Sequence, residues 1–365
     1  MRLSPGWLCL WGAAALLAGF ARTQAPVVVA AVGGWDVGPE ERAIKQGIEL
    51  AVQQVNDSGG IKGRRLEVQF KDDRNDNQLA AQVAQQLVAD PTVVAVIGHT
   101  RSDPTLVAMK VYDGVMPVVS ARLSSPDITG LSRWVFQLVP ADSAYSATVT
   151  AFAERRNSRR AVLLFNNTAR GRAQAFFFKQ LYRGEVLGMD PVGFPVPPAG
   201  DMAIFAQWHK LQTPDLVFLP IGAERAQEYV RAAQQEGLSA AVIGWDVWAP
   251  ITRDPSLPGE FYRLVPFDLG ANRPETQRFL SALQARGAAP DHFAALGYDA
   301  LRLIAVAART SATRDGIREA IAAYTSNRTF PGVIGPIYFG QDGNVVGPQP
   351  VVVPLSSAPR TSTGS

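Results

Sequence analysis

The chain has little of the side-chain chemistry that disulfides and most metal sites need. It contains one cysteine, Cys9, and three histidines among 365 residues. A disulfide within the chain needs a second cysteine, and a cysteine-ligated zinc site needs several. His99, His209 and His292 are far apart in the sequence, and no HExxH spacing occurs. The sequence therefore excludes a disulfide framework, gives no support to metal-dependent hydrolysis and leads us to expect no cofactor.

Clustered positive charge and long apolar runs are also scarce. The formal net charge is only +3, and nucleic-acid binding needs a clustered basic surface, so no nucleic-acid partner is expected. The apolar run Leu8–Phe20 is shorter than the roughly 18 residues of a membrane-spanning helix. It follows Arg2 and precedes small residues, which is typical of a secretory signal peptide. We expect a peptide within residues 1–25 to be removed after Ala21 or Ala25, leaving a periplasmic monomer.

Signatures of common enzymes are missing too. The sequence has no GxSxG elbow and no GxxxxGKS loop. Gly33 and Gly34 follow the first apolar run but lack the remaining spacing of a dinucleotide-binding fingerprint. We therefore predict that the protein is not an enzyme. The alternative, an α/β hydrolase or dehydrogenase, would require a nucleophile with a base or a nicotinamide site.

Short apolar runs alternate with amphipathic segments along almost the whole chain. This pattern is typical of repeated strand and helix units around a parallel sheet. About 340 residues after the signal peptide exceed what one hydrophobic core usually serves, so we expect two lobes. The predicted strands are 27–32, 66–70, 93–97, 116–119, 161–165, 216–219 and 241–243. The later predicted helices are 274–286, 292–309 and 313–324.

The alternation is interrupted at three places, where extended segments are flanked by Pro or Gly. These segments lie near 137–142, 264–268 and 334–338. Three such places predict three strands that cross between the lobes and form a hinge. The resulting division is 26–140 plus 268–336 for lobe I, 141–267 plus 337–355 for lobe II, and a disordered tail at 356–365.

Residues 93–127 contain two apolar strands that each end in a loop of Gly, Ser and Thr. In open α/β sheets, small ligands bind at the carboxyl ends of the strands. Helix N-termini at this edge offer unpaired N–H groups and a positive dipole to an anion. The sequence therefore predicts a binder of a small carboxylate-bearing molecule.

Several segments together resemble one known family. They are NDSGGIKGRRLEV, KDDRNDNQLAAQVAQQLV, VVAVIGH, LGYDALRLIA and FPGVIGPIYFGQDGN. In order and spacing they are similar to the periplasmic leucine-, isoleucine- and valine-binding proteins of ATP-driven importers. The resemblance covers residues 27 to about 353 and implies the type I periplasmic binding fold: two Rossmann-like α/β lobes that close on a ligand around a three-strand hinge. It also implies an ABC-type permease in the inner membrane as partner.

The resemblance implies specific ligand contacts. Ser102 corresponds to a serine that binds the ligand carboxylate. Ser124 corresponds to a hydroxyl residue that contacts both carboxylate and ammonium, with a backbone carbonyl from around Arg122. Asp246, in the GWD segment, corresponds to the acid that pairs with the ammonium. A hydroxyl donor at one end and an anion at the other suit an amino acid.

The sequence also departs from the family pattern. The first loop is shorter and offers Trp35 or Glu40 where the family places an aromatic residue over the ligand, and Arg170 replaces a second aromatic residue. Trp245 is a further candidate for lining the pocket. Arg170 and Arg122 would favour a ligand with a second acidic group. An importer or sensor for amides, urea or aromatic acids is therefore the alternative to an amino-acid carrier.

Overall fold

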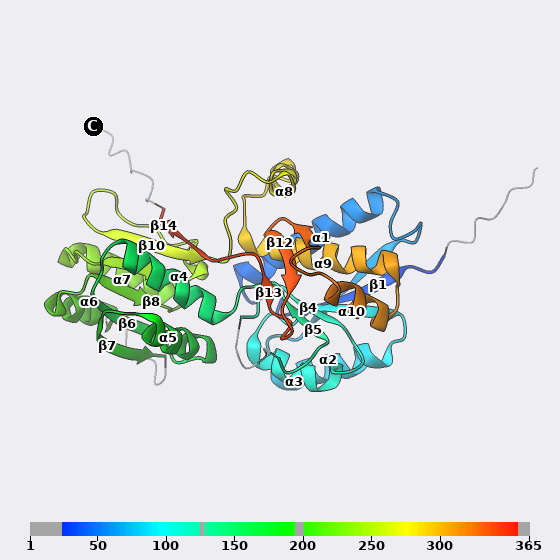
Figure 1. Cartoon of the computed structure of the whole chain (residues 1–365), viewed down its shortest axis with the longest axis horizontal. Helices are drawn as coiled ribbons and strands as arrows, with labels where there is room; N and C mark the ends of the chain where they lie inside the picture. Colours follow the sequence, from blue (N-terminus) through cyan, green and yellow to red (C-terminus); the bar gives the residue numbers. More distant parts are fainter. Residues whose placement is uncertain (1–23, 125–127, 129, 194–200, 357–365) are drawn as a thin grey trace, which may run out of the picture.

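Two largely parallel β-sheets form two lobes that lie side by side along the long axis of the molecule (Figure 1). The computed structural model describes residues 24–124, 128, 130–193 and 201–356. The predicted signal peptide and the predicted tail lie almost entirely outside these residues. Among the helices that the structure describes, none combines the length and the apolar composition needed to cross a lipid bilayer.

The first sheet has the strand order β2-β1-β3-β4-β5, and all its strands run parallel. The strands are β1 (Val27–Gly33), β2 (Leu66–Asp72), β3 (Val93–Gly98), β4 (Val118–Ser120) and β5 (Val135–Gln137). The helices of this lobe are α1 (Pro39–Asp57), α2 (Asn77–Ala89), α3 (Ser102–Tyr112), α8 (Pro274–Ala285), α9 (His292–Thr310) and α10 (Arg314–Ala322). Every residue of β1 is buried. An uninterrupted apolar sequence suits this strand because helices cover both faces of the sheet.

The second sheet has the order β14-β10-β9-β8-β6-β7, in which only β14 runs antiparallel to its neighbour. The strands are β6 (Arg160–Asn166), β7 (Glu185–Val192), β8 (Leu216–Leu219), β9 (Ala241–Gly244), β10 (Glu260–Val265) and β14 (Val351–Pro354). The helices are α4 (Asp142–Arg155), α5 (Ala169–Leu181), α6 (Asp201–Gln212) and α7 (Ala223–Glu236), with the 3₁₀ turn η1 (Asp246–Trp248). The parallel arrangement in each lobe confirms the predicted α/β class.

Helix α9 crosses α1 at very short range in the first lobe. A Cβ atom on Gly47 would lie 1.9 Å from the carbonyl oxygen of Ala294, and one on Gly297 would lie 2.2 Å from that of Ile44. Only glycine permits the two backbones to approach this closely. This contact attaches the C-terminal helices to the lobe that the N-terminal half of the chain begins.

The chain passes between the two sheets three times. The first passage lies between β5 and α4, and the second lies between β10 and α8, close to the predicted segments. The third prediction, 334–338, is displaced. These residues form most of β12 (Gly335–Phe339), which pairs with β11 (Phe330–Gly332) and β13 (Val345–Val346) in a small antiparallel sheet.

The hairpin forms at this place because Ile337 is buried and Phe339 packs edge-on against Phe136, with 5.0 Å between the ring centroids. The chain reaches the second sheet only at β14, after residues 347–350. The third passage lies beside α4, the helix that follows the first passage, since the hydroxyl of Thr148 donates to the carbonyl of Pro350 at 3.3 Å.

Candidate functional site

A cleft of about 1000 Å³ is lined by residues of both lobes. From the first lobe come residues 37, 40, 75–77, 100–104 and 122–124. From the second come residues 166–170, 222–223, 245 and 247. Each of these segments follows the carboxyl end of a parallel strand. This is the edge at which open α/β sheets bind their ligands.

Helix N-termini open onto this cleft from both lobes. Residues of the first turns of α3 and α5 line it, as does Ala223 at the start of α7. The start of α5 is fixed by Thr168, whose hydroxyl accepts from the N–H of Gly171 at 3.2 Å. Because the N-terminus of a helix carries partial positive charge, the arrangement favours an anion in the cleft.

Arg170 lies in the first turn of α5, where a cation opposes the helix dipole. Its Nη1 and Nη2 atoms lie 3.4 and 3.2 Å from the two carboxylate oxygens of Asp246. Its guanidinium carbon lies 4.8 Å from the ring centroid of Trp245 and 5.3 Å from that of Tyr145. Burial acts to raise the pKa of Asp246, but the charge and hydrogen bonds of Arg170 outweigh it and hold that pKa below its ordinary value. The pair is therefore ionised at neutral pH.

Asp142, the first residue of α4, connects the two lobes. Its Oδ1 accepts from the hydroxyl of Ser124 at 3.0 Å and from the side-chain amide of Gln174 at 2.9 Å. Trp245 donates in turn to Oε1 of Gln174 at 2.5 Å. Burial raises the pKa of Asp142 to about 6, against the opposing effects of the Arg170 charge and these two hydrogen bonds.

The first lobe contributes a second arginine, Arg122. Its loop is shaped by Ser120, whose hydroxyl accepts from the N–H groups of Arg122 and Leu123 at 3.4 and 3.2 Å. The Nη1 atom of Arg122 lies 3.9 Å from a carboxylate oxygen of Glu40 and 3.9 Å from one of Glu41. These distances are long for an arginine–carboxylate hydrogen bond. Within the described part of the chain, this buried nitrogen has no hydrogen-bond partner.

Glu41 and Arg101 complete this group of charges in the first lobe. The side chain of Glu41 is fully buried, and its Oε1 lies 2.9 Å from Nη2 of Arg101. Arg101 lines the cleft and is 42% exposed at its side chain. Burial and the neighbouring charge of Arg101 lower the pKa of Arg122, although an arginine remains charged at neutral pH.

Most of the predicted site residues lie at the cleft. Ser102, Ser124, Arg122, Arg170 and Trp245 all line it. Two details differ from the prediction. The hydroxyl of Ser124 donates to Asp142 instead of being free for a ligand. Asp246 does not face the cleft as a free anion, because it is 4% exposed and lies behind Arg170.

The predicted role of Trp35 is wrong. Its side chain is 5% exposed and belongs to the core of the first lobe. The indole N–H donates to the carbonyl of Lys71 at 2.8 Å, and the ring packs edge-on against Phe70. The shortened loop after β1 turns this aromatic ring inward against β2. Trp35 therefore takes no part in lining the cleft.

The sequence prediction missed Asp142, Gln174, Glu41 and Arg101. The acid at the start of α4 follows Pro140 and Ala141, a pattern that indicates a helix start but no binding role. Gln174 is buried on α5 and had no distinguishing pattern at all. Both residues act through contacts with segments far away in the sequence.

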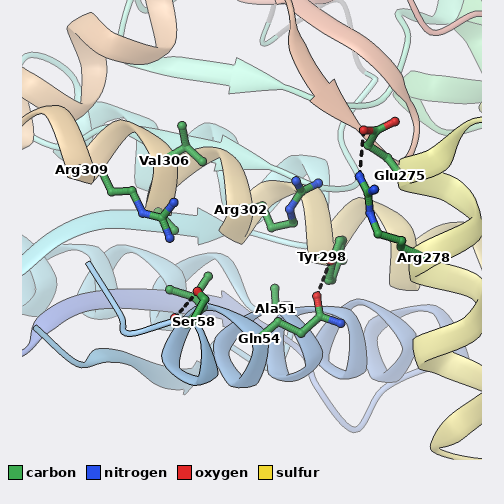
Figure 2. Close-up of a pocket in the computed structure, with 11 residues that line it drawn as sticks. Ala51, Gln54, Ser58, Glu275, Arg278, Tyr298, Arg302, Val306 and Arg309 are labelled. Carbon is green, nitrogen blue, oxygen red and sulfur yellow. Dashed lines mark hydrogen bonds and ion pairs between the residues drawn. The ribbon is translucent and has the colours of Figure 1, made fainter. Parts of the chain in front are cut away.

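A second hollow lies on the outer surface of the first lobe. This groove, of about 450 Å³, runs between α1, α8 and α9 and shares no lining residue with the cleft (Figure 2). The hydroxyl of Tyr298 donates across it to Gln54 at 2.5 Å. The arginines of the groove include Arg302, which pairs with Asp299, and Arg278, which pairs with Glu275. The cleft, with charged groups from both lobes and with helix N-termini, is therefore the better candidate site.

Comparison with known proteins agrees with this architecture. The sequence profile of the family described as periplasmic binding protein matches residues 28–353. The leucine-, isoleucine-, valine-, threonine- and alanine-binding protein of Pseudomonas aeruginosa is 28% identical over 243 residues, which span 64% of this chain and 64% of that protein.

Solved structures with the same fold include two ligand complexes. An ABC transporter substrate-binding protein from Desulfitobacterium hafniense in complex with Leu has a TM-score of 0.80 at 21% identity, covering 91% of this chain and 98% of its own. A solute-binding protein from R. palustris in complex with benzoate has a TM-score of 0.74 at 19% identity, covering 91% and 96%. With the profile matched over nearly all the described residues, the chain belongs to the periplasmic binding protein family, whose members bind solutes.

Proposed function

We propose that the protein captures a small carboxylate-bearing molecule in the cleft between its lobes and delivers it to an ABC-type permease. The observation that carries this proposal is the placement of Arg122 and Arg170. They come from different lobes, line the same cleft and lie among helix N-termini. A volume of about 1000 Å³ is at the upper end of the usual range for small-molecule sites, so the cleft has room for a small carboxylate-bearing molecule.

The ligands of the similar proteins support a carboxylate. The Desulfitobacterium hafniense structure holds leucine and the R. palustris structure holds benzoate. The chemical group that these two ligands share is a carboxylate, and only leucine carries an amine. The fold therefore accommodates both types of acid, and the side chains of this cleft decide between them.

The permease, the periplasmic location and the monomeric state belong to the same proposal. They are supported by family membership and by the N-terminal sequence pattern of a signal peptide. We expect no catalysed reaction, because a carrier only has to bind its solute and release it. Incubation of the bound acid with the protein should return the acid unchanged.

A thermal-shift screen of the mature protein tests the proposal. The panel contains amino acids, aromatic acids, dicarboxylates, neutral amides and urea. A ligand that binds only the folded state raises the melting temperature, by an amount that grows with its concentration. We expect a carboxylate to give the largest shift, in the wild type and in the control variant Arg309→Ala, whose exposed side chain lies at the groove on the first lobe. A shift with amides or urea alone would contradict the proposal.

A further inference from the structure

The acid that corresponds to the family's ammonium-binding residue is already occupied by a cation of this chain. Both carboxylate oxygens of Asp246 lie within hydrogen-bond distance of Arg170, at 3.4 and 3.2 Å. Oδ1 also accepts from the N–H of Val247 at 2.9 Å. The side chain of Asp246 is 5% exposed, whereas that of Arg170 is 20% exposed and lines the cleft. A ligand therefore meets the arginine before it can reach the acid.

Arg170 is held in this position from several sides. Its guanidinium lies over the rings of Trp245 and Tyr145, both of which are buried. Its Nε atom lies 3.5 Å from Oδ1 of Asp142. Trp245 and Asp142 are themselves joined through Gln174. Moving the Arg170 side chain away from these two rings and two acids would be energetically unfavourable, because it would leave the charge of Asp246 buried without its partner.

We infer that the ligand carries a carboxylate but no cationic amine, and that Arg170 is the residue that excludes the amine. This inference rests on the proposed function and specifies its ligand class. An ammonium group at this end of the cleft would face a fixed like charge, which disfavours binding. An amine-free acid needs no displacement of Arg170, and its carboxylate has arginines of both lobes available as partners.

One of those partners is Arg122 on the opposite lobe. Its buried Nη1 has no hydrogen-bond partner in the described ranges, and its acidic neighbours Glu40 and Glu41 are 3.9 Å away. Arg170, on the second lobe, also lines the cleft, with its Nε atom buried 3.5 Å from Oδ1 of Asp142. Both lobes therefore present an arginine side chain to an anionic ligand in the cleft. A ligand with one carboxylate can use either arginine, and a dicarboxylate can use both.

Titration calorimetry with matched pairs of acids tests the inference. Each pair differs only in the amine: 3-phenylpropanoate and phenylalanine, 4-methylpentanoate and leucine, glutarate and glutamate. For the tightest pair in the wild type, we expect the amine-free acid to bind at least about 30-fold more tightly, as for an unfavourable desolvated charge contact. In Arg170→Ala, which uncovers Asp246, this preference should fall by about the same factor. Arg309→Ala should keep the wild-type preference.

The wild-type comparison decides the question even if Arg170→Ala does not fold. Equal or tighter binding of the amino acid in the tightest pair would overturn the inference while leaving carboxylate capture intact. An unchanged preference in a folded Arg170→Ala protein would overturn the role of Arg170. Binding of neither member of any pair at millimolar concentration would contradict carboxylate capture itself, and the inference with it.

Discussion

The guanidinium of Arg170 lies within hydrogen-bond distance of both carboxylate oxygens of Asp246, and Arg170 lines the cleft between the lobes. The arginine is in the first turn of α5 and the acid in the turn after β9, which are 76 residues apart in the sequence. Because the acid is almost fully buried, its charge depends on the arginine. The two side chains therefore act as one unit, both for stability and for ligand choice.

Replacing one member of this pair should lower the free energy of unfolding more than replacing both. Asp246→Leu leaves the Arg170 cation largely buried beside Asp142 alone, and we expect it to lower the free energy of unfolding by about 3 kcal/mol. The double variant Arg170→Met/Asp246→Leu should recover at least half of that loss, since it removes both charges and keeps apolar volume. Urea unfolding of the wild type, the two single variants and the double variant gives the coupling free energy between the two side chains. Additive losses would show that the two charges are not coupled.

The two serines of the cleft should respond differently to truncation. Ser124 donates to the buried Asp142, so Ser124→Ala should lower the free energy of unfolding by about 1 kcal/mol. Ser102 lines the cleft at the start of α3, so Ser102→Ala should leave stability within about 0.5 kcal/mol and weaken the ligand by up to about 10-fold. Unfolding curves and calorimetric titrations of both variants separate these effects. The reverse assignment, with Ser102 needed for stability, would contradict the geometry.

Asp142 should make the free energy of unfolding fall as the pH rises, which is the opposite of the usual effect of a carboxylate. Its pKa is about 6 in the folded state against an ordinary value of 3.8, so the folded state binds the proton more tightly. The stability contributed by protonation is therefore lost as the pH rises from about 4 to above 6, and amounts to about 3 kcal/mol. We expect the free energy of unfolding of the wild type, minus that of Asp142→Asn, to decrease by about 2 kcal/mol between pH 4 and pH 7. A difference that is independent of pH would show that Asp142 titrates normally.

The three passages between the sheets predict closure of the lobes on the ligand. Binding should bring Arg122 and Arg170 towards the same anion, so the radius of gyration in small-angle X-ray scattering should decrease at saturating ligand. The same ligand added to a variant that no longer binds it serves as the control. Identical scattering profiles with and without ligand would contradict closure.

Several of the strands that the sequence predicted correctly are uninterrupted apolar runs. The runs at 93–97 and 216–219 became β3 and β8, which lie inside their sheets, where helices cover both faces. The strand β7 was missed because EVLGMDPV contains Gly, Asp and Pro. It lies at the edge of its sheet, where proline and partly exposed side chains are tolerated. Burial alone did not decide which strands were recognisable, because the partly exposed edge strand β2 was also predicted.

The candidate site was predictable only where a residue follows the end of a strand. Ser102, Ser124, Arg170 and Trp245 satisfy this condition, and all four line the cleft. Trp35 also satisfies it, but the packing of its ring on Phe70 turns it into the core. Asp142 and Gln174 could not be found in this way, because their roles come from contacts between α4, α5 and the loop after β4. Such contacts depend on how the helices pack, which local sequence does not determine.

Hydrogen–deuterium exchange with the tightest acid from the screen tests the central claim most directly, because it locates the bound ligand. If the cleft is the site, exchange should slow in residues 100–104, 122–124, 167–172 and 245–248, which come from both lobes. Residues 51–58 and 298–309, which line the groove of the first lobe, should be unchanged and serve as the internal control. Protection confined to the groove, or to one lobe alone, would contradict capture of the acid between the lobes.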